Sequence, residues 1–218
     1  MPRLLFEKKG MAVWISHLDL MRVFQRAFKR AGLPLTHSHG FNPRPSVSIA
    51  LPLSVGVESE CELLDFALDG CNVTCEEIRS RLNSVLTAGI RVLDVYEEGR
   101  KIRDLSLLRC EIIMTYDHGM PQGAMQAVSE LFAKDSVVVA KKTKTGMQDQ
   151  NIATMIRSFE TKCEGDRMIL SALICCQNPT LNPAQIPLAI AMHLPEFAPD
   201  FSVCKRLEVY DSNEKIFR

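Results

Sequence analysis

The chain has 218 residues, of which 46% are hydrophobic and 24% are charged, a composition that is typical of globular proteins and excludes a disordered chain. Because 26 Lys and Arg residues balance 26 Asp and Glu residues, the protein is not globally basic, although this balance leaves room for a local basic patch. No run of about 18 apolar residues and no signal peptide is present, so we expect a cytoplasmic protein that does not contact a membrane.

Residues 1–98 show the pattern strand, helix, strand, strand, helix, strand. Ser16 and Asp19 are the cap and first-turn acid of a helix start, and Gly32 and Pro34 are typical of its end. The predicted elements are a strand or hairpin over 3–15, a helix over 17–31, strands over 46–51 and 62–68, a helix over 75–88 and a strand over 90–96. This order is the split pattern of a ferredoxin-like sandwich.

Residues 105–218 show a degenerate repeat of the same order. The predicted elements are a strand over 107–116, a helix over 121–133, a strand from 137, a helix or irregular connection over 151–159, a strand over 168–174, a helix over 183–194 and a strand over 206–210. The charged segment 97–104 suits a linker. The sequence therefore predicts an α+β protein of tandem ferredoxin-like sandwiches with mainly antiparallel sheets and with domains 1–98 and 105–218.

Eight cysteines are present, most of them inside apolar runs. Nothing indicates a secreted protein, so we interpret them as reduced thiols that act as small hydrophobic residues. Cys71 and Cys75 lack the further Cys or His ligands that a zinc or iron–sulfur site needs. We expect neither a metal nor another cofactor, because no phosphate-binding glycine loop or catalytic elbow motif occurs either.

The helix over 17–31 is amphipathic. Its predicted apolar stripe consists of Leu18, Met21, Phe24 and Phe28. The opposite face carries Arg22, Arg26, Lys29 and Arg30 at spacings of three and four residues. Such a face is either an ordinary solvated surface or a stripe that follows the phosphates of a nucleic acid, since Arg and Lys supply the positioning contacts to a backbone.

The loop after this helix combines three residue types that suit nucleic-acid binding. Phe41 can stack on a base, Asn42 can bind a base edge, and Arg44 can reach a phosphate or a base. Pro43 and Pro45 stiffen the loop, which lowers the entropy cost of binding. The alternative is a rigid turn that packs Phe41 into the core. A second basic element consists of Lys141, Lys142 and Lys144.

His17 is a weak candidate for a catalytic residue. It lies in the first helical turn, where the helix dipole favours the neutral form of an imidazole that acts as a base. Tandem ferredoxin-like ribonucleases that process CRISPR RNA are similar in architecture, and several use a His near the first helix. No acid partner for His17 can be assigned from the sequence, so a structural role is the alternative.

Four segments carry a family resemblance, namely residues 9–22, 25–34, 40–45 and 51–59. They resemble the radical-SAM-linked family, a bacterial domain of unknown function that is fused to radical SAM proteins or encoded beside them. The resemblance implies a radical SAM protein as partner. The chain itself lacks the Cys-x-x-x-Cys-x-x-Cys cluster motif, so it is not the radical SAM catalyst.

Three hypotheses about function follow. The first is a non-catalytic module that binds RNA, ribosomal or transfer RNA for example, or presents another substrate to the radical SAM enzyme. The second is an enzyme that processes or modifies RNA through His17. The third is a protein-docking subunit that binds no nucleic acid.

Overall fold

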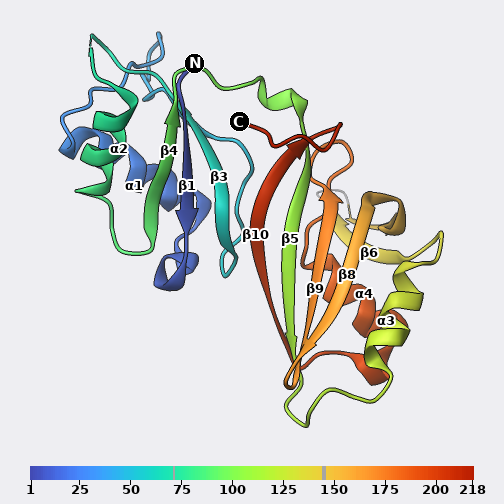
Figure 1. Ribbon diagram of the computed structural model, residues 1–218. Helices are drawn as coiled ribbons and strands as arrows, with labels where there is room; N and C mark the ends of the chain where they lie inside the picture. The colour runs from blue at the N-terminus through green and yellow to red at the C-terminus, as the bar shows by residue number, and fades with distance from the viewer. Residues whose placement is uncertain (71, 144–145) are drawn as a thin grey trace. The chain divides into compact units, whose positions relative to one another are not determined.

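The computed structural model describes residues 1–70, 72–143 and 146–218. It is a mixed α+β structure with mostly antiparallel strands, and it divides into two compact units (Figure 1). The first unit is Met1–Asp104 with Phe217–Arg218, and the second is Leu105–Ile216. The division falls at the end of the segment 97–104, and the last two residues lie with the first unit rather than with the second half of the sequence.

An antiparallel sheet with the strand order β4-β1-β3-β2 forms the first unit. Leu4 of β1 lies between Leu64 of β3 and Val95 of β4, which sets the register of the sheet. The elements are β1 (Arg3–Lys8), η1 (Gly10–Trp14), α1 (His17–Arg30), β2 (Val47–Ile49), β3 (Glu58–Phe66), α2 (Cys75–Asn83), β4 (Ile90–Tyr96) and η2 (Ile102–Asp104).

α1 and α2 share one hydrophobic core with this sheet (Figure 1). Leu20, Phe24 and Phe28 of α1 are buried together with Ile78 of α2. The prediction that Leu18 belongs to the buried stripe is wrong, because its side chain is 68% exposed. Leu20 takes that place, since four residues separate it from Phe24 and both lie on one helix face.

The segment after β1 differs from the predicted hairpin. It forms the 3₁₀ helix η1 and not a second strand. The buried Lys8 ammonium donates hydrogen bonds to the carbonyl oxygens of Val13, at 3.1 Å, and Ile15, at 2.8 Å. A buried ammonium needs acceptors, and these two carbonyl groups can reach it only when the chain curls back over β1.

In the second unit, the main sheet has the antiparallel order β10-β5-β9-β8, and α3 contacts β8 and α4. A separate hairpin consists of β6 and β7. The elements are β5 (Leu105–Thr115), α3 (Ala124–Phe132), β6 (Val138–Thr143), β7 (Gly146–Asn151), η3 (Ala153–Met155), β8 (Ile156–Glu164), β9 (Arg167–Cys175), α4 (Gln185–His193), η4 (Pro195–Phe197) and β10 (Phe201–Asp211).

β7 and β8 are absent from the predicted elements. The ambiguous segment 151–159 is resolved into η3 and the first half of β8. β8 is an edge strand whose charged Glu160, Lys162 and Glu164 alternate along a largely solvated surface. Such a strand has few apolar residues to reveal it, because charged side chains protect sheet edges from further pairing.

No helix within the described parts of the chain has the length and apolar character needed to span a membrane. The described thiols are all free, and five of them are buried, as expected for small hydrophobic residues: Cys61, Cys110, Cys175, Cys176 and Cys204.

Candidate nucleic-acid interface

The basic stripe on α1 is exposed along its length but is not uniform. Arg22 forms an ion pair with Asp19 at 2.7 Å, and Arg30 Nη2 donates a 2.6 Å hydrogen bond to the carbonyl oxygen of Val85. Within the described residues, Arg26 and Lys29 have no side-chain partner. The cations of this stripe that are available to a ligand are therefore Arg26 and Lys29.

Asp19 also completes the start of the helix. The Ser16 hydroxyl donates a 2.7 Å hydrogen bond to its carboxylate and accepts one from its backbone N–H. The Ser16 hydroxyl, and after it the Arg22 guanidinium, lower the pKa of the Asp19 carboxyl from its ordinary value. Arg22 thus belongs to the hydrogen-bonded network at the start of α1.

The loop 36–46 is a narrow, hydrogen-bonded projection. Ser46 N–H donates to Thr36 O at 2.8 Å, and Ser38 N–H donates to Arg44 O at 2.9 Å. Arg44 N–H donates in turn to the Ser38 hydroxyl at 3.0 Å. These bonds close the two arms of the loop and leave residues 39–43 at the tip, all of them exposed.

Phe41 lies at this tip, and its relative accessibility is 105%. The alternative in which Phe41 packs into the core is therefore wrong. Asn42 and Arg44 are exposed as well, and within the described residues neither side chain has a hydrogen-bond or ion-pair partner. The three residues that the sequence singled out for base and phosphate contacts are thus open to solvent on one loop.

The base of the loop is tied to the sheet of the first unit. Thr36 N–H donates to Ala67 O and Asp69 N–H donates to Pro34 O, both at 2.9 Å. Leu35 pairs with Leu68 as an isolated bridge. The loop is therefore held by backbone hydrogen bonds on both of its arms and at its root.

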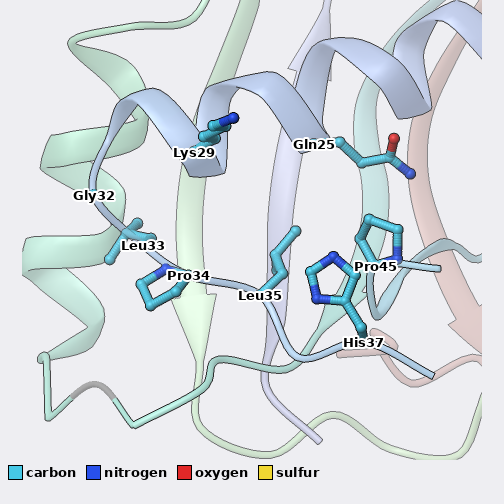
Figure 2. A pocket seen from close by; sticks show the side chains of 8 residues that line it. All are labelled: Gln25, Lys29, Gly32, Leu33, Pro34, Leu35, His37 and Pro45. Atoms are coloured by element: carbon cyan, nitrogen blue, oxygen red, sulfur yellow. The ribbon is translucent and has the colours of Figure 1, made fainter. Parts of the chain in front are cut away.

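A pocket of about 470 Å³ lies between α1 and the root of this loop (Figure 2). Figure 2 shows Lys29 and Gln25 on the helix side of the hollow, with Leu35, His37 and Pro45 on the opposite side. The full lining is Gln25, Lys29, Gly32, Leu33, Pro34, Leu35, His37 and Pro45.

The end of α1 shapes one wall of the pocket. Gly32 has a φ of +67°, and its N–H donates to Lys29 O, while Leu33 N–H donates to Phe28 O. This pair of bonds is a Schellman motif, which requires a left-handed residue and so favours glycine. It turns the chain back under the helix, so that Pro34 and Leu35 face the last turn of α1.

A family described as an uncharacterized protein conserved in bacteria (DUF2344) matches residues 2–183. The chain belongs to the DUF2344 family. No curated protein matches this DUF2344 chain.

Among solved structures, a chain in the crystal structure of a Cbf5-Nop10-Gar1 complex is similar, with a TM-score of 0.53 and 9% identity over 95% of this chain and 48% of that chain. The DUF2344 protein thus spans about half the length of that chain, and the likeness concerns the fold alone. The crystal structure of an unknown protein from Galdieria sulphuraria aligns over 94% of this chain and 95% of that chain, with 13% identity and a TM-score of 0.26.

The other predicted site residues lie elsewhere. His17 is the first residue of α1 and is half-buried, and its buried Nδ1 atom has no hydrogen-bond partner among the residues that the structure describes. Lys141 and Lys142 belong to β6, and Lys144 lies outside the described residues. The described part of the chain contains no group of three or more His, Cys, Asp or Glu side chains that could hold a metal ion.

Sequence reasoning missed the pocket. Gln25 and Lys29 are four residues apart, a spacing that places them on one helix face. His37 and Pro45 become neighbours only because the loop closes on itself. The sequence holds no signal for that closure except the density of Pro and Gly.

Proposed function

We propose that this DUF2344 protein is a non-catalytic module that binds single-stranded or looped RNA through α1 and the loop 36–46 and presents it to a radical SAM enzyme. The observation that carries the proposal is the exposure of Phe41 at the tip of a loop whose arms and root are hydrogen-bonded. A fully exposed aromatic ring gains nothing for folding, whereas a base stacked on it contributes about 1–3 kcal/mol to binding.

The cations around the loop support the same proposal. Arg26, Lys29 and Arg44 are exposed and have no partner within the described residues. Arg and Lys side chains of this kind neutralise phosphates and release counterions, which makes affinity fall as salt rises. The closed loop loses little conformational freedom on binding, so less of the interaction energy is lost to ordering.

The finer parts of the proposal concern fold, partner and location. The strand orders β4-β1-β3-β2 and β10-β5-β9-β8, each with two helices in the sequence, support a ferredoxin-like assignment for each unit. The resemblance to the radical-SAM-linked family supports a radical SAM protein as partner. A cytoplasmic location and single-stranded or looped parts of ribosomal or transfer RNA as cargo complete the proposal.

Substitution of Phe41 by Ala tests the RNA-binding function. We expect affinity for a single-stranded RNA to fall by about 1–3 kcal/mol, because one stacking platform is lost, and the melting temperature to stay unchanged. Phe201→Ala is the matched control, since Phe201 is also an exposed phenylalanine but lies in β10. Equal affinities for wild type and Phe41→Ala would overturn the proposal for this loop.

The salt dependence of RNA binding tests the cations independently. Arg26→Gln and Arg44→Gln are each expected to make the slope of log K against log salt shallower by about one. Lys134→Gln, which removes an exposed cation after α3, serves as the control and should leave the slope unchanged. If neither Arg26→Gln nor Arg44→Gln alters the salt slope, then neither cation belongs to the interface.

A second candidate function is protein docking. Met11, Trp14 and Leu18 are all exposed, at 83%, 65% and 68%, within eight residues of the chain. Trp14 is the only tryptophan, so its emission reports on this surface directly. A blue shift on titration with a purified radical SAM protein, abolished by Leu18→Lys, is the expected result if this surface docks the partner.

A further inference from the structure

The pocket between α1 and the root of the loop presents polar groups that have no protein partner. Within the described residues, the side chains of Gln25, Lys29 and His37 form neither a hydrogen bond nor an ion pair. They line the same hollow from two sides (Figure 2). Together they offer an amide that both donates and accepts, a cation and an imidazole.

The remaining walls are largely apolar. Pro34, Leu35 and Pro45 contribute ring faces and a branched side chain to the lining. Apolar walls with a few polar groups are the usual composition of small-molecule sites, and a volume of about 470 Å³ falls within their usual range of about 300–1,000 Å³. A planar ring with a polar edge suits such a hollow better than a flexible aliphatic chain, because the polar edge can pair with the Gln25 amide.

The pocket is also preorganised. The Schellman motif at Gly32 fixes the end of the helix, and the Thr36–Ala67 and Asp69–Pro34 backbone hydrogen bonds fix the opposite wall. Its ligand therefore does not have to order the walls when it binds, which favours affinity.

We infer that this pocket holds one unstacked nucleotide of the RNA strand, with its base between the apolar walls and its phosphate at Lys29. The inference rests on the proposed RNA-binding function and names a second subsite for it. His37 and Phe41 are four residues apart, so their Cα atoms lie at most ~14 Å from one another. A strand of a few nucleotides covers that length, so one base stacks on Phe41 while a neighbour enters the pocket.

The experiment compares two probes, a fluorescein-labelled single-stranded RNA and free nucleoside monophosphates, by anisotropy and by calorimetry. Gln25→Phe fills the pocket without a change of charge, and Lys29→Gln removes its cation. Gln126→Phe on α3 is the control, since it makes the same substitution on an exposed helix residue that does not line this pocket. Thermal unfolding of each variant verifies the fold.

We expect Gln25→Phe and Lys29→Gln each to weaken both probes by roughly tenfold, the effect of losing one charge-assisted contact or one base site. Phe41→Ala should weaken the RNA and leave the nucleoside monophosphates unaffected, because its ring lies outside the pocket. Excess nucleoside monophosphate should displace the RNA from the wild-type protein only in part, since the Phe41 subsite remains.

Two failures are distinguishable. If Phe41→Ala weakens the RNA but Gln25→Phe and Lys29→Gln do not, the pocket inference is overturned and the RNA-binding function stands. If the wild-type protein does not bind the RNA at all, the proposed function is overturned and the pocket inference with it.

Discussion

The phenylalanines of the first unit have two opposite environments. Phe24 contacts Phe6 edge to face with ring centroids 4.7 Å apart, and Phe28 contacts Phe66 at 5.1 Å, all four inside the core. Phe41 makes no such contact with any other described residue and is fully exposed. Burial of an aromatic ring stabilises the fold, whereas an exposed ring leaves its apolar surface available to a ligand.

Alanine substitutions should separate these environments. Phe24→Ala is expected to reduce the free energy of unfolding by about 3–5 kcal/mol, because it opens a cavity in the core. Phe41→Ala should change it by no more than about 0.5 kcal/mol, as at other exposed positions. Urea denaturation measures both values, and a large destabilisation by Phe41→Ala would contradict the exposed position of the loop tip.

The described thiols differ in exposure, and we expect them to differ in reactivity as well. Desolvation raises the pKa of the Cys110 and Cys176 thiols to about 12 and that of Cys204 to about 11, whereas Cys163 is exposed. The reactive species is the thiolate, so buried thiols are unreactive near neutral pH.

Iodoacetamide at pH 8 should therefore modify Cys163 in the native protein and leave Cys110, Cys176 and Cys204 unmodified until urea unfolds the chain. Peptide mapping by mass spectrometry distinguishes the sites. Rapid modification of Cys110 without urea would show that the core of the second unit opens readily.

At the scale of elements, the start of α2 is set by a capping box. Thr74 Oγ1 accepts from Glu77 N–H at 3.2 Å, and Glu77 Oε2 accepts from Thr74 N–H at 2.8 Å. This backbone N–H, followed by the Thr74 hydroxyl, lowers the pKa of the Glu77 carboxyl from its ordinary 4.5. At the start of α1 the Ser16 hydroxyl likewise accepts from Asp19 N–H, but the Asp19 carboxylate accepts from the Ser16 hydroxyl and not from its backbone N–H.

Thr74→Ala should cost about 1 kcal/mol of stability, because a helix N–H loses its acceptor. The Glu77 contribution has a defined pH dependence. The pKa of Glu77 is lower in the folded state than in the unfolded state. Its contribution to stability is therefore complete at a pH above the unfolded-state pKa, and it is lost as the pH falls through the folded-state pKa. Glu77→Gln should therefore flatten the loss of stability between about pH 5 and pH 3. An unchanged pH profile would argue against the capping role.

At the scale of the whole molecule, the chain returns to its first unit at residue 217. Phe217 is completely buried, and the guanidinium carbons of Arg3 and Arg100 lie 5.4 and 5.0 Å from its ring centroid. Arg3 also forms an ion pair with Asp65 at 2.6 Å, and Arg100 N–H donates to Arg218 O at 3.0 Å. Residues from both ends of the sequence thus complete one unit.

Phe217→Ala should destabilise the first unit by about 3–5 kcal/mol, because it removes a buried ring and leaves Arg3 without its aromatic contact. Hydrogen exchange measures the two units separately. Amides of β1 and β3 are expected to lose protection, while those of β5 and β9 keep theirs. Equal loss in both units would mean that they do not unfold independently.

The fold of the first unit was largely predictable from the sequence. α1 spans residues 17–30, close to the predicted 17–31. Its cap at Ser16, its apolar stripe and its stop at Gly32 are all local signals in the sequence. β8 was missed because its charged residues suit an edge strand and lack an apolar period. η1 was missed because it depends on Lys8 finding carbonyl groups further along the chain.

The interface shows the same division. The sequence by itself determined the basic face of α1 and the aromatic, proline-bounded loop, since those features depend on residues that are near one another in the chain. Only the tertiary structure decided that Arg30 donates to the carbonyl oxygen of Val85, 55 residues away, and that Gln25, His37 and Pro45 line one pocket. It also decided that Phe41 lies in solvent and Phe217 in the core. Whether an aromatic ring is buried depends on which distant segments pack around it, and no local pattern of residues contains that information.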